Sequence, residues 1–480
     1  MKNPDLSDFQ IVIDEIFRLH TLINKREFKR LDKYDVFWDI KDPRNGRRVL
    51  IGQKGRQAFC DVAKRTLKQD VHLRKRVSEG VVLQAISEEF AREILGNGES
   101  LSPALAKDIV ANALAVARGR LDKQVCHFIP CVLAYHSSKD QFNIGPVSFQ
   151  TTASFIAERA RQFDEETQRT IQLWAKGAAK HSGTFRNLWP VLHLKKEAAA
   201  FTESAIKILK SYKWIATVQL QDFEETVGRD VANSCVETAL NIARLFIGGE
   251  HAEQFRIGGG LRLERDSVRL SENHAGEISI TLSHTSEDAQ LGKDWVNGRF
   301  GGEAEQWVQL AGSLIRKLQS GFDIPILYRR YIIALWWYGE GVSEPHDHAK
   351  VVRFATAIEA YLATPIEKDD AGKPVESIMD QLSRRACNLL EDNASDEGRE
   401  ICREIKKFYD IRSRLVHGEY APFDKTAATF AFKGERLVRK ILIEGLSWTS
   451  WLASQNYNMT VKEIGEHFDS VLPKVKISKS

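Results

Sequence analysis

Long apolar runs and a secretory leader are both missing from this chain of 480 residues. No stretch reaches the run of about 18 apolar residues that a membrane-spanning helix needs. The first residues, MKNPDLSDFQ, have neither the basic start nor the apolar core of a signal peptide. We therefore expect no association with a membrane and a cytoplasmic location.

Cysteine is scarce, and no two cysteines form a Cys-x2-Cys pair. Six scattered cysteines in a chain of this length do not make the disulfide framework of a small secreted domain. We expect reduced and buried thiols. The six are Cys60, Cys126, Cys131, Cys235, Cys387 and Cys402.

The signatures of common catalytic and nucleotide-binding loops are also absent. Gly258-Gly-Gly260 lacks the Lys-Ser/Thr that follows a phosphate-binding loop, and we expect a turn there. No Gly-x-Ser-x-Gly turn of a serine hydrolase occurs. Two clusters of metal-capable side chains are better explained as a hydrated loop and an apolar strand. They are His346-Asp-His348 and the group Cys126, His127, Cys131 and His136. We expect no metal and no cofactor.

What the chain does contain is an ordinary globular composition, with 43% hydrophobic and 28% charged residues. Its net charge of +4 is too small to identify a nucleic-acid partner. The segment from Lys41 to Arg76, however, holds twelve Lys or Arg against three Asp. This excess can attract phosphate-bearing ligands, and it is equally typical of a solvated helix face.

Hydrophobic periodicity predicts a mainly helical α+β protein with small antiparallel sheets in a mixed N-terminal region. Helices are expected over 7–33, 54–95 (broken at Val71 or Gly80), 103–123, 151–213 and 224–249. Strands are expected as the pairs 36–40 with 47–52 and 125–136 with 142–150, as a buried strand 214–220, and as a meander over 253–283.

These elements suggest a division into domains. From 301 to 455 nearly every residue has a helical pattern. We expect a basic mixed region over 1–150, a helical region with the meander over 151–320, a helical domain over 324–455 and a tail over 456–480. The first two regions can also form one unit.

One helix organises the rest of the chain, residues 401–418 with the sequence ICREIKKFYDIRSRLVHG. Its apolar residues recur at three-, four- and seven-residue steps and predict a buried stripe. The stripe consists of Ile401, Ile405, Phe408 and Leu415. Arg412 projects from this stripe, where a guanidinium without a partner is costly. It is therefore expected to have an anionic partner or a functional role.

His417 follows Arg412 by five residues and directly precedes Gly418, a residue that favours the end of a helix. Five helical residues turn by about 500°, which leaves the two side chains roughly 140° apart. They can converge only if the helix ends near Val416 or if a second subunit contributes. Such a pair fits metal-free RNA cleavage by the ribose 2′-hydroxyl, because histidine can transfer protons and arginine can hold phosphoryl oxygens.

The pattern Arg412-Ser-Arg-Leu-Val-His417 resembles the Arg-x4-His signature of the HEPN superfamily of helical ribonucleases. Upstream, residues 334–362 look like the paired helices of the ApeA-like branch, including its acidic position at Glu359. Downstream, 426–455 fits the closing helix of that fold. The resemblance covers about 324–455 and implies an all-helical HEPN-like bundle there.

The resemblance also implies roles for individual residues. Arg412 and His417 match the catalytic positions, which meet between subunits in dimeric members. Ser413 fills the small polar position after the arginine, and Glu359 is placed to orient Arg412. In the branch that is regulated by adenylylation of a tyrosine, the modified tyrosine lies two residues after the histidine. Tyr420 departs from this pattern, because it lies three residues after His417. We therefore do not expect control by that route, and Tyr420 stays an alternative target.

Basic residues beside the motif are a further candidate for binding RNA phosphates. They fit the solvated face of an amphipathic helix equally well. They are Lys406, Lys407 and Arg414.

Two functions remain open at this stage. The first is a dimeric, metal-independent endoribonuclease that cleaves tRNA or ribosomal RNA in prokaryotic anti-phage defence by abortive infection, with a phage-derived trigger or an inhibitory partner. The second is a non-catalytic dimerisation, nucleotide-binding or RNA-binding module with a partner-binding N-terminal region. In the second, Arg412 forms a buried ion pair with Glu359, and His417 caps a helix.

Overall fold

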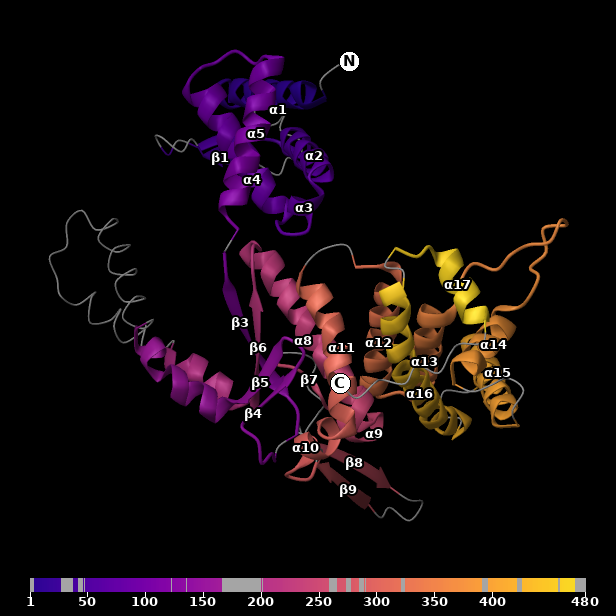
Figure 1. Cartoon of the computed structure of the whole chain (residues 1–480). Coiled ribbons are helices and arrows are strands. Elements are labelled where there is room, and N and C mark those ends of the chain that lie inside the picture. The colour runs from indigo at the N-terminus through magenta and orange to yellow at the C-terminus, as the bar shows by residue number, and fades with distance from the viewer. Residues whose placement is uncertain are drawn as a thin grey trace. The chain divides into compact units, whose positions relative to one another are not determined.

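The computed structural model describes residues 4–26, 38–41, 46, 48–121, 123–134, 136–165, 200, 202–258, 266–272, 278–284, 289, 291–320, 324–390, 396–420, 425–455 and 458–470. Its elements are labelled in Figure 1. They confirm the predicted mainly helical α+β fold. The chain forms two compact units, Met1–Val125 with Gln219–Ala232, and Cys126–Val218 with Asn233–Ser480.

The first unit packs helices and a β-hairpin around an aromatic core. Its elements are α1 (Pro4–Asn24), β1 (Trp38–Lys41), β2 (Arg48–Ile51), α2 (Gln53–Gln69), α3 (Val71–Arg74), α4 (Glu79–Phe90), the π-helical turn η2 (Ala91–Gly96) and α5 (Pro103–Gly119). The rings of Phe9, Phe59 and Phe90 meet at centroid distances of 5.3, 5.5 and 6.2 Å. The predicted hairpin is confirmed. The helix predicted over 54–95 does break, at Asp70 and again over 75–78, while Gly80 lies inside α4. Residues 27–37, where we expected the first helix to end, lie outside the described part.

Acidic neighbours partly neutralise the basic segment 41–76. The ion pairs of its described residues include Arg48–Asp39, Lys64–Glu79, Arg65–Asp5, Arg65–Asp8 and Arg76–Asp222. Arg65 has two of these partners, because its guanidinium reaches two carboxylates of α1. The segment therefore presents fewer unpaired cations than its composition suggests.

A five-stranded sheet in the order β4-β5-β6-β3-β7 lies at the start of the second unit. Its strands are β3 (Val125–Val132), β4 (Gln141–Ile144), β5 (Val147–Thr151), β6 (Trp214–Leu220) and β7 (Arg256–Ile257). The predicted buried strand over 214–220 is confirmed. The predicted pairing of 125–136 with 142–150 was wrong, because 142–150 folds back on itself at Gly145 (φ +59°) and forms β4 and β5.

The predicted meander over 253–283 was also wrong in its connectivity. β8 (Asp266–Glu272) and β9 (Ile278–His284) form a separate antiparallel pair, whereas β7 joins β3 in the larger sheet. Gly258 lies in the turn after β7, as expected, while residues 259–265 lie outside the described part. A strand of two residues carries too weak a pattern to show which sheet it enters.

The rest of the described second unit is mainly helical (Figure 1). Outside the bundle lie a helix over 152–165, one over 202–210, α8 (Glu225–Ile247), α9 (Gly249–Ala252), α10 (Trp295–Phe300) and α11 (Glu303–Gln319). The helical bundle consists of α12 (Ile326–Ser343), α13 (Asp347–Leu362), α14 (Ile378–Leu390), α15 (Asp396–Val416), α16 (Lys425–Gln455) and α17 (Val461–Asp469).

Buried tyrosines fasten the bundle to its longest helix, α16. Tyr331 of α12 donates to the carbonyl of Leu442 at 2.7 Å, and Tyr361 of α13 donates to the carbonyl of Gly445 at 2.8 Å. Tyr338 of α12 is buried, whereas its neighbours Trp336 and Trp337 are 38% and 39% exposed. The aromatic residues 336–338 are therefore divided between core and surface.

The boundaries of the units differ from those expected from the sequence. The first unit ends at Val125 rather than at 150, because β3, β4 and β5 belong to the sheet of the second unit. The expected tail over 456–480 contains α17, whose Ile464 and Phe468 are buried. The first difference arises from long-range strand pairing, whereas α17 carried a local signal, the capping box of Thr460 and Glu463, that the sequence interpretation missed.

One disulfide corrects the expectation of six reduced thiols. Cys387 of α14 and Cys402 of α15 are bonded, with their Cα atoms 5.8 Å apart. Packing of α14 against α15 brings the two residues together although 15 positions separate them in sequence. Cys60, Cys126, Cys131 and Cys235 are free.

Within the described ranges, every helix is too short or too polar to cross a membrane.

Candidate active site

The site is built on the last turns of α15, and most of the predicted stripe is buried. Ile401, Ile405 and Phe408 are 6%, 1% and 2% exposed, while Leu415 is half-buried. Phe408 is held against α16 at Gly434, where a Cβ would overlap its ring. This close approach fixes the position of α15 against the bundle.

The end of α15 follows the signal that Gly418 gives in the sequence. The helix ends at Val416, and Gly418 adopts a φ of +77°, a left-handed conformation that glycine accepts without strain. The amide of Gly418 donates to the carbonyl of Leu415 at 3.2 Å, and the amide of Glu419 donates to that of Arg414 at 2.9 Å. These bonds form a Schellman motif. His417 therefore lies just beyond the helix, as the proposed convergence with Arg412 requires.

Arg412 faces α13, where Glu359 provides the carboxylate expected from the sequence. The nearest atoms, Nη2 of Arg412 and Oε1 of Glu359, are 3.6 Å apart, and each side chain is 27% exposed. The guanidinium carbon also lies 5.5 Å from the ring centroid of Tyr409. Within the described residues Nε of Arg412 is buried without a hydrogen-bond partner. Charge, rather than a hydrogen bond, thus holds this guanidinium.

Tyr409 completes the cluster, and the sequence interpretation missed it. Its hydroxyl donates to Oε1 of Glu359, and its side chain is 9% exposed. Burial and the hydrogen bond to the carboxylate raise the pKa of Tyr409 well above its usual value. The signal available in the sequence was its spacing, because Tyr409 precedes Arg412 by three residues and shares its side of the helix.

His417 is exposed, and its backbone amide donates to the carbonyl of Ser413 at 3.0 Å. Its imidazole has no recorded partner among the residues that the structure describes. The single chain therefore brings Arg412, Glu359 and Tyr409 together and leaves His417 facing solvent. Contact between His417 and Arg412 would need a second copy or a bound substrate.

The other predicted site residues mostly have partners within the chain. Lys406 lies 2.7 Å from Asp380, and this hydrogen bond lowers the pKa of Asp380. Arg414 lies 2.8 Å from Glu419 and stacks on Tyr420 at 4.7 Å. The ammonium of Lys407 lies 5.8 Å from the ring centroid of Phe430. These contacts fit a solvated helix face, and RNA would have to compete with them.

The metal-capable clusters do not assemble a ligand set. No group of three or more His, Cys, Asp or Glu with the spacing of a metal site occurs in the described part of the chain. His346 and His348 stack with centroids 6.4 Å apart at the start of α13. Cys126 is exposed while Cys131 is buried, and burial raises the pKa of the Cys131 thiol.

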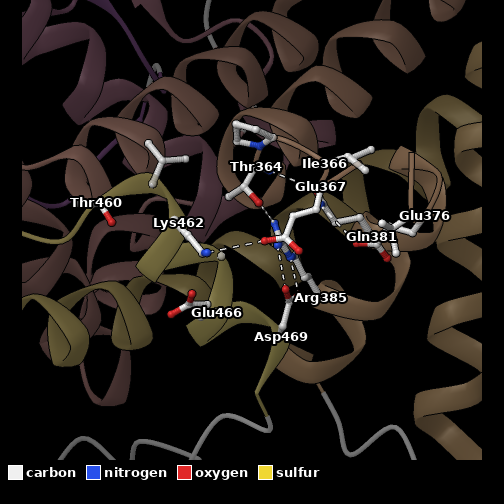
Figure 2. Close-up of a pocket in the computed structure, with 14 residues that line it drawn as sticks. Thr364, Ile366, Glu367, Glu376, Gln381, Arg385, Thr460, Lys462, Glu466 and Asp469 are labelled. Atoms are coloured by element: carbon white, nitrogen blue, oxygen red, sulfur yellow. Dashed lines mark hydrogen bonds and ion pairs between the residues drawn. The ribbon is translucent and has the colours of Figure 1, made fainter. Parts of the chain in front are cut away.

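A cavity of about 580 Å³ lies between the end of α13, α14 and α17. Figure 2 shows Arg385 at the centre of its lining, hydrogen-bonded to Asp469 and Thr364. Lys462 reaches across to Glu367 at 3.8 Å. Its lining cations thus face carboxylates of the same cavity. The sequence interpretation missed Arg385, although a charged residue on the apolar side of 378–390 is the signal that identified Arg412.

The fold and the site together define a mainly helical α+β protein whose C-terminal bundle brings an arginine, a carboxylate and a tyrosine together, with an exposed histidine just after the same helix. Comparison with protein-family models, with curated proteins and with solved structures found no match to this chain.

Proposed function

We propose that this chain is a metal-independent endoribonuclease of the HEPN type, with its active site at the end of α15. Arg412 and His417 are the catalytic residues of the proposal, and Glu359 orients Arg412. The Arg-x4-His pattern and the helical context of the resemblance support it. So does the position of His417, directly after the last residue of α15.

One observation carries the proposal. The guanidinium of Arg412 is kept beside Glu359 at 3.6 Å, yet its buried Nε has no partner among the described residues. An unsatisfied buried donor costs free energy, and among the described arginines Arg412 shares this feature at Nε with Arg244. Arg412 differs in that its side chain is 27% exposed, and a guanidinium that solvent reaches suits the planar recognition of phosphoryl oxygens.

The chemistry follows from these groups. The ribose 2′-oxygen attacks the adjacent phosphorus, and the bond from phosphorus to the 5′-oxygen breaks. One imidazole accepts the 2′-hydroxyl proton and another donates a proton to the leaving 5′-oxygen. Arg412 stabilises the charge that develops on the phosphoryl oxygens. The products are a 2′,3′-cyclic phosphate and a 5′-hydroxyl, and DNA is not cleaved because it lacks the nucleophile.

A homodimer supplies the second imidazole in this scheme. The exposure of His417 fits that arrangement, because the ring is free to meet its counterpart across an interface. The proposed setting is the prokaryotic cytoplasm, where cleavage of tRNA or ribosomal RNA would stop translation as an anti-phage response. A phage-derived trigger or an inhibitory partner would act through the N-terminal region.

Cleavage assays with tRNA and ribosomal RNA test the proposal. His417→Ala should lower kcat/KM by about 10²- to 10⁴-fold, the usual contribution of a positioned acid or base. His346→Ala is the matched control, because it removes an exposed imidazole of the same bundle outside the motif. RNA ends should carry cyclic phosphate, and a 2′-deoxy nucleotide at the cleaved position should block the reaction. Equal cleavage by wild type and His417→Ala would end the proposal.

The second candidate function is a non-catalytic dimerisation or RNA-binding module. The contact between Arg412 and Glu359 also favours it, because this ion pair joins α13 to α15. Arg412→Ala separates the two. A folded variant that has lost cleavage supports the enzyme, whereas an unfolded variant supports the module.

A further inference from the structure

Tyr409, Glu359 and Arg412 form a closed triangle in which each side chain contacts the other two. Tyr409 and Arg412 lie one turn apart on α15, and Glu359 reaches them from α13. The same carboxylate oxygen, Oε1, accepts the hydrogen bond from Tyr409 and is the atom nearest to Arg412. Tyr409 and Arg412 therefore compete for the same oxygen of Glu359.

The contacts that Tyr409 and Arg412 make with Glu359 differ in type. The tyrosine contact is a hydrogen bond, made by a side chain that is 9% exposed. The arginine contact is an ion pair at 3.6 Å, beyond the range of about 2.7–2.9 Å of a strong charge-assisted hydrogen bond. Glu359 is therefore anchored to Tyr409 and only attracted to Arg412.

This difference matters because carboxylate and phosphate compete for the same donors. A carboxylate free to move could form two parallel hydrogen bonds with the guanidinium, which is the strongest geometry available to the pair. A phosphoryl group would then have to displace it. A carboxylate held at 3.6 Å still sets the direction of the guanidinium by charge while its N–H groups stay open.

We propose that Tyr409 is a positioning residue whose hydroxyl restrains Glu359, so that Arg412 is oriented but remains available to a phosphoryl group. This inference rests on the proposed function, since it assigns to Arg412 a phosphate-bearing ligand. Tyr409 itself need not touch the substrate. The restraint acts through Glu359, and its effect should vanish when Glu359 cannot bind Arg412 strongly.

A double-mutant cycle tests that dependence. Tyr409→Phe keeps the buried ring and removes only the hydroxyl, so Glu359 should close on Arg412 and kcat/KM should fall about tenfold, as expected for losing one hydrogen bond to a charged group. In the Glu359→Gln background the same change should have no effect, because a neutral amide cannot form the paired ionic contact. Tyr331→Phe is the matched control, since it removes a buried hydroxyl that binds only the carbonyl of Leu442.

A readout independent of cleavage keeps this inference separate from the proposed function. The Nε–H resonance of Arg412, assigned by its loss in Arg412→Lys, is followed by NMR while inorganic phosphate is titrated. Phosphate should bind about tenfold more weakly to Tyr409→Phe than to wild type, by the same loss of one charged hydrogen bond. If the protein shows this difference in phosphate affinity but cleaves no RNA, the role of Tyr409 is supported and the proposed nuclease activity is rejected.

Three outcomes would overturn the role of Tyr409. The first is an unchanged phosphate affinity in Tyr409→Phe. The second is an equal loss from Tyr409→Phe in both backgrounds, which indicates a general structural effect. If Tyr409→Phe does not fold, Glu359→Gln is compared with the double variant Glu359→Gln/Tyr409→Phe. The third outcome is a weaker phosphate affinity in the double variant than in Glu359→Gln.

Discussion

Two arginines of the same helical bundle face carboxylates in contrasting ways. Arg385 of α14 is 3% exposed and donates to both oxygens of Asp469 at 2.7 and 3.0 Å, to the carbonyl of Leu362 and to Thr364. Arg412 of α15 is 27% exposed and lies 3.6 Å from Glu359, with Nε unpartnered among the described residues. A guanidinium with four hydrogen bonds to the bundle is part of the scaffold. One with an unpartnered donor, five residues before an exposed histidine, is a candidate for chemistry.

The largest expected effect on stability is at Arg385. Arg385→Ala should lower the free energy of unfolding by about 2 kcal/mol, the cost of losing hydrogen bonds of a charged group, because Asp469 is 35% exposed and keeps Arg384 as a partner. Urea denaturation measures the change. Arg384→Ala, which removes a neighbouring guanidinium that is 38% exposed, should cost at most about 1 kcal/mol. Equal losses in the two variants would contradict the comparison.

A smaller effect is expected where α16 supports the site. Gly434→Ala places a Cβ against the buried ring of Phe408. Overpacking costs about 1–3 kcal/mol, and the better helix propensity of alanine returns up to about 1 kcal/mol. We expect the free energy of unfolding, measured by urea denaturation, to fall by about 1 kcal/mol. Phe408→Leu should recover stability in the Gly434→Ala background if the overlap is the cause, and no recovery would point elsewhere.

Local signals in the sequence predicted much of the Arg412 region. The stripe in 401–418 and the end at Val416 follow from spacing within the helix, whereas Glu359 was expected to face Arg412 from the resemblance to the HEPN family. The region around Arg385 was not predicted, because its partner Asp469 lies 84 positions away in a segment expected to be a tail. The pairing of β3 and the disulfide of α14 with α15 were missed for the same reason. Tertiary packing decides the strand pairing and the disulfide. The charge of Arg385 on an apolar helix face and the Thr460/Glu463 capping box of α17 were local signals that the interpretation missed.

Low pH should weaken the ion pair between Arg385 and Asp469 in particular. Burial alone would raise the pKa of Asp469, but hydrogen bonds from Arg385 and Arg384 outweigh burial and lower it. A carboxyl with a lowered pKa stabilises the fold above its unfolded pKa of about 3.9, and this contribution is lost as the pH falls through the folded value. The difference in urea midpoint between wild type and Asp469→Asn should therefore be full at pH 7 and shrink below about pH 4. A constant difference would show that the charge of Asp469 does not stabilise the pair.

The smallest expected effect on stability is at Arg412 itself. Arg412→Ala removes an ion pair at 3.6 Å whose side chains are each 27% exposed, together with a contact on the Tyr409 ring. Such partly exposed contacts contribute at most about 1 kcal/mol, so the variant should unfold close to wild type in urea. Glu359 is not left isolated, because Tyr409 still donates to it. A loss near that of Arg385→Ala would place Arg412 in the scaffold with Arg385, and the open donors would then have no functional meaning.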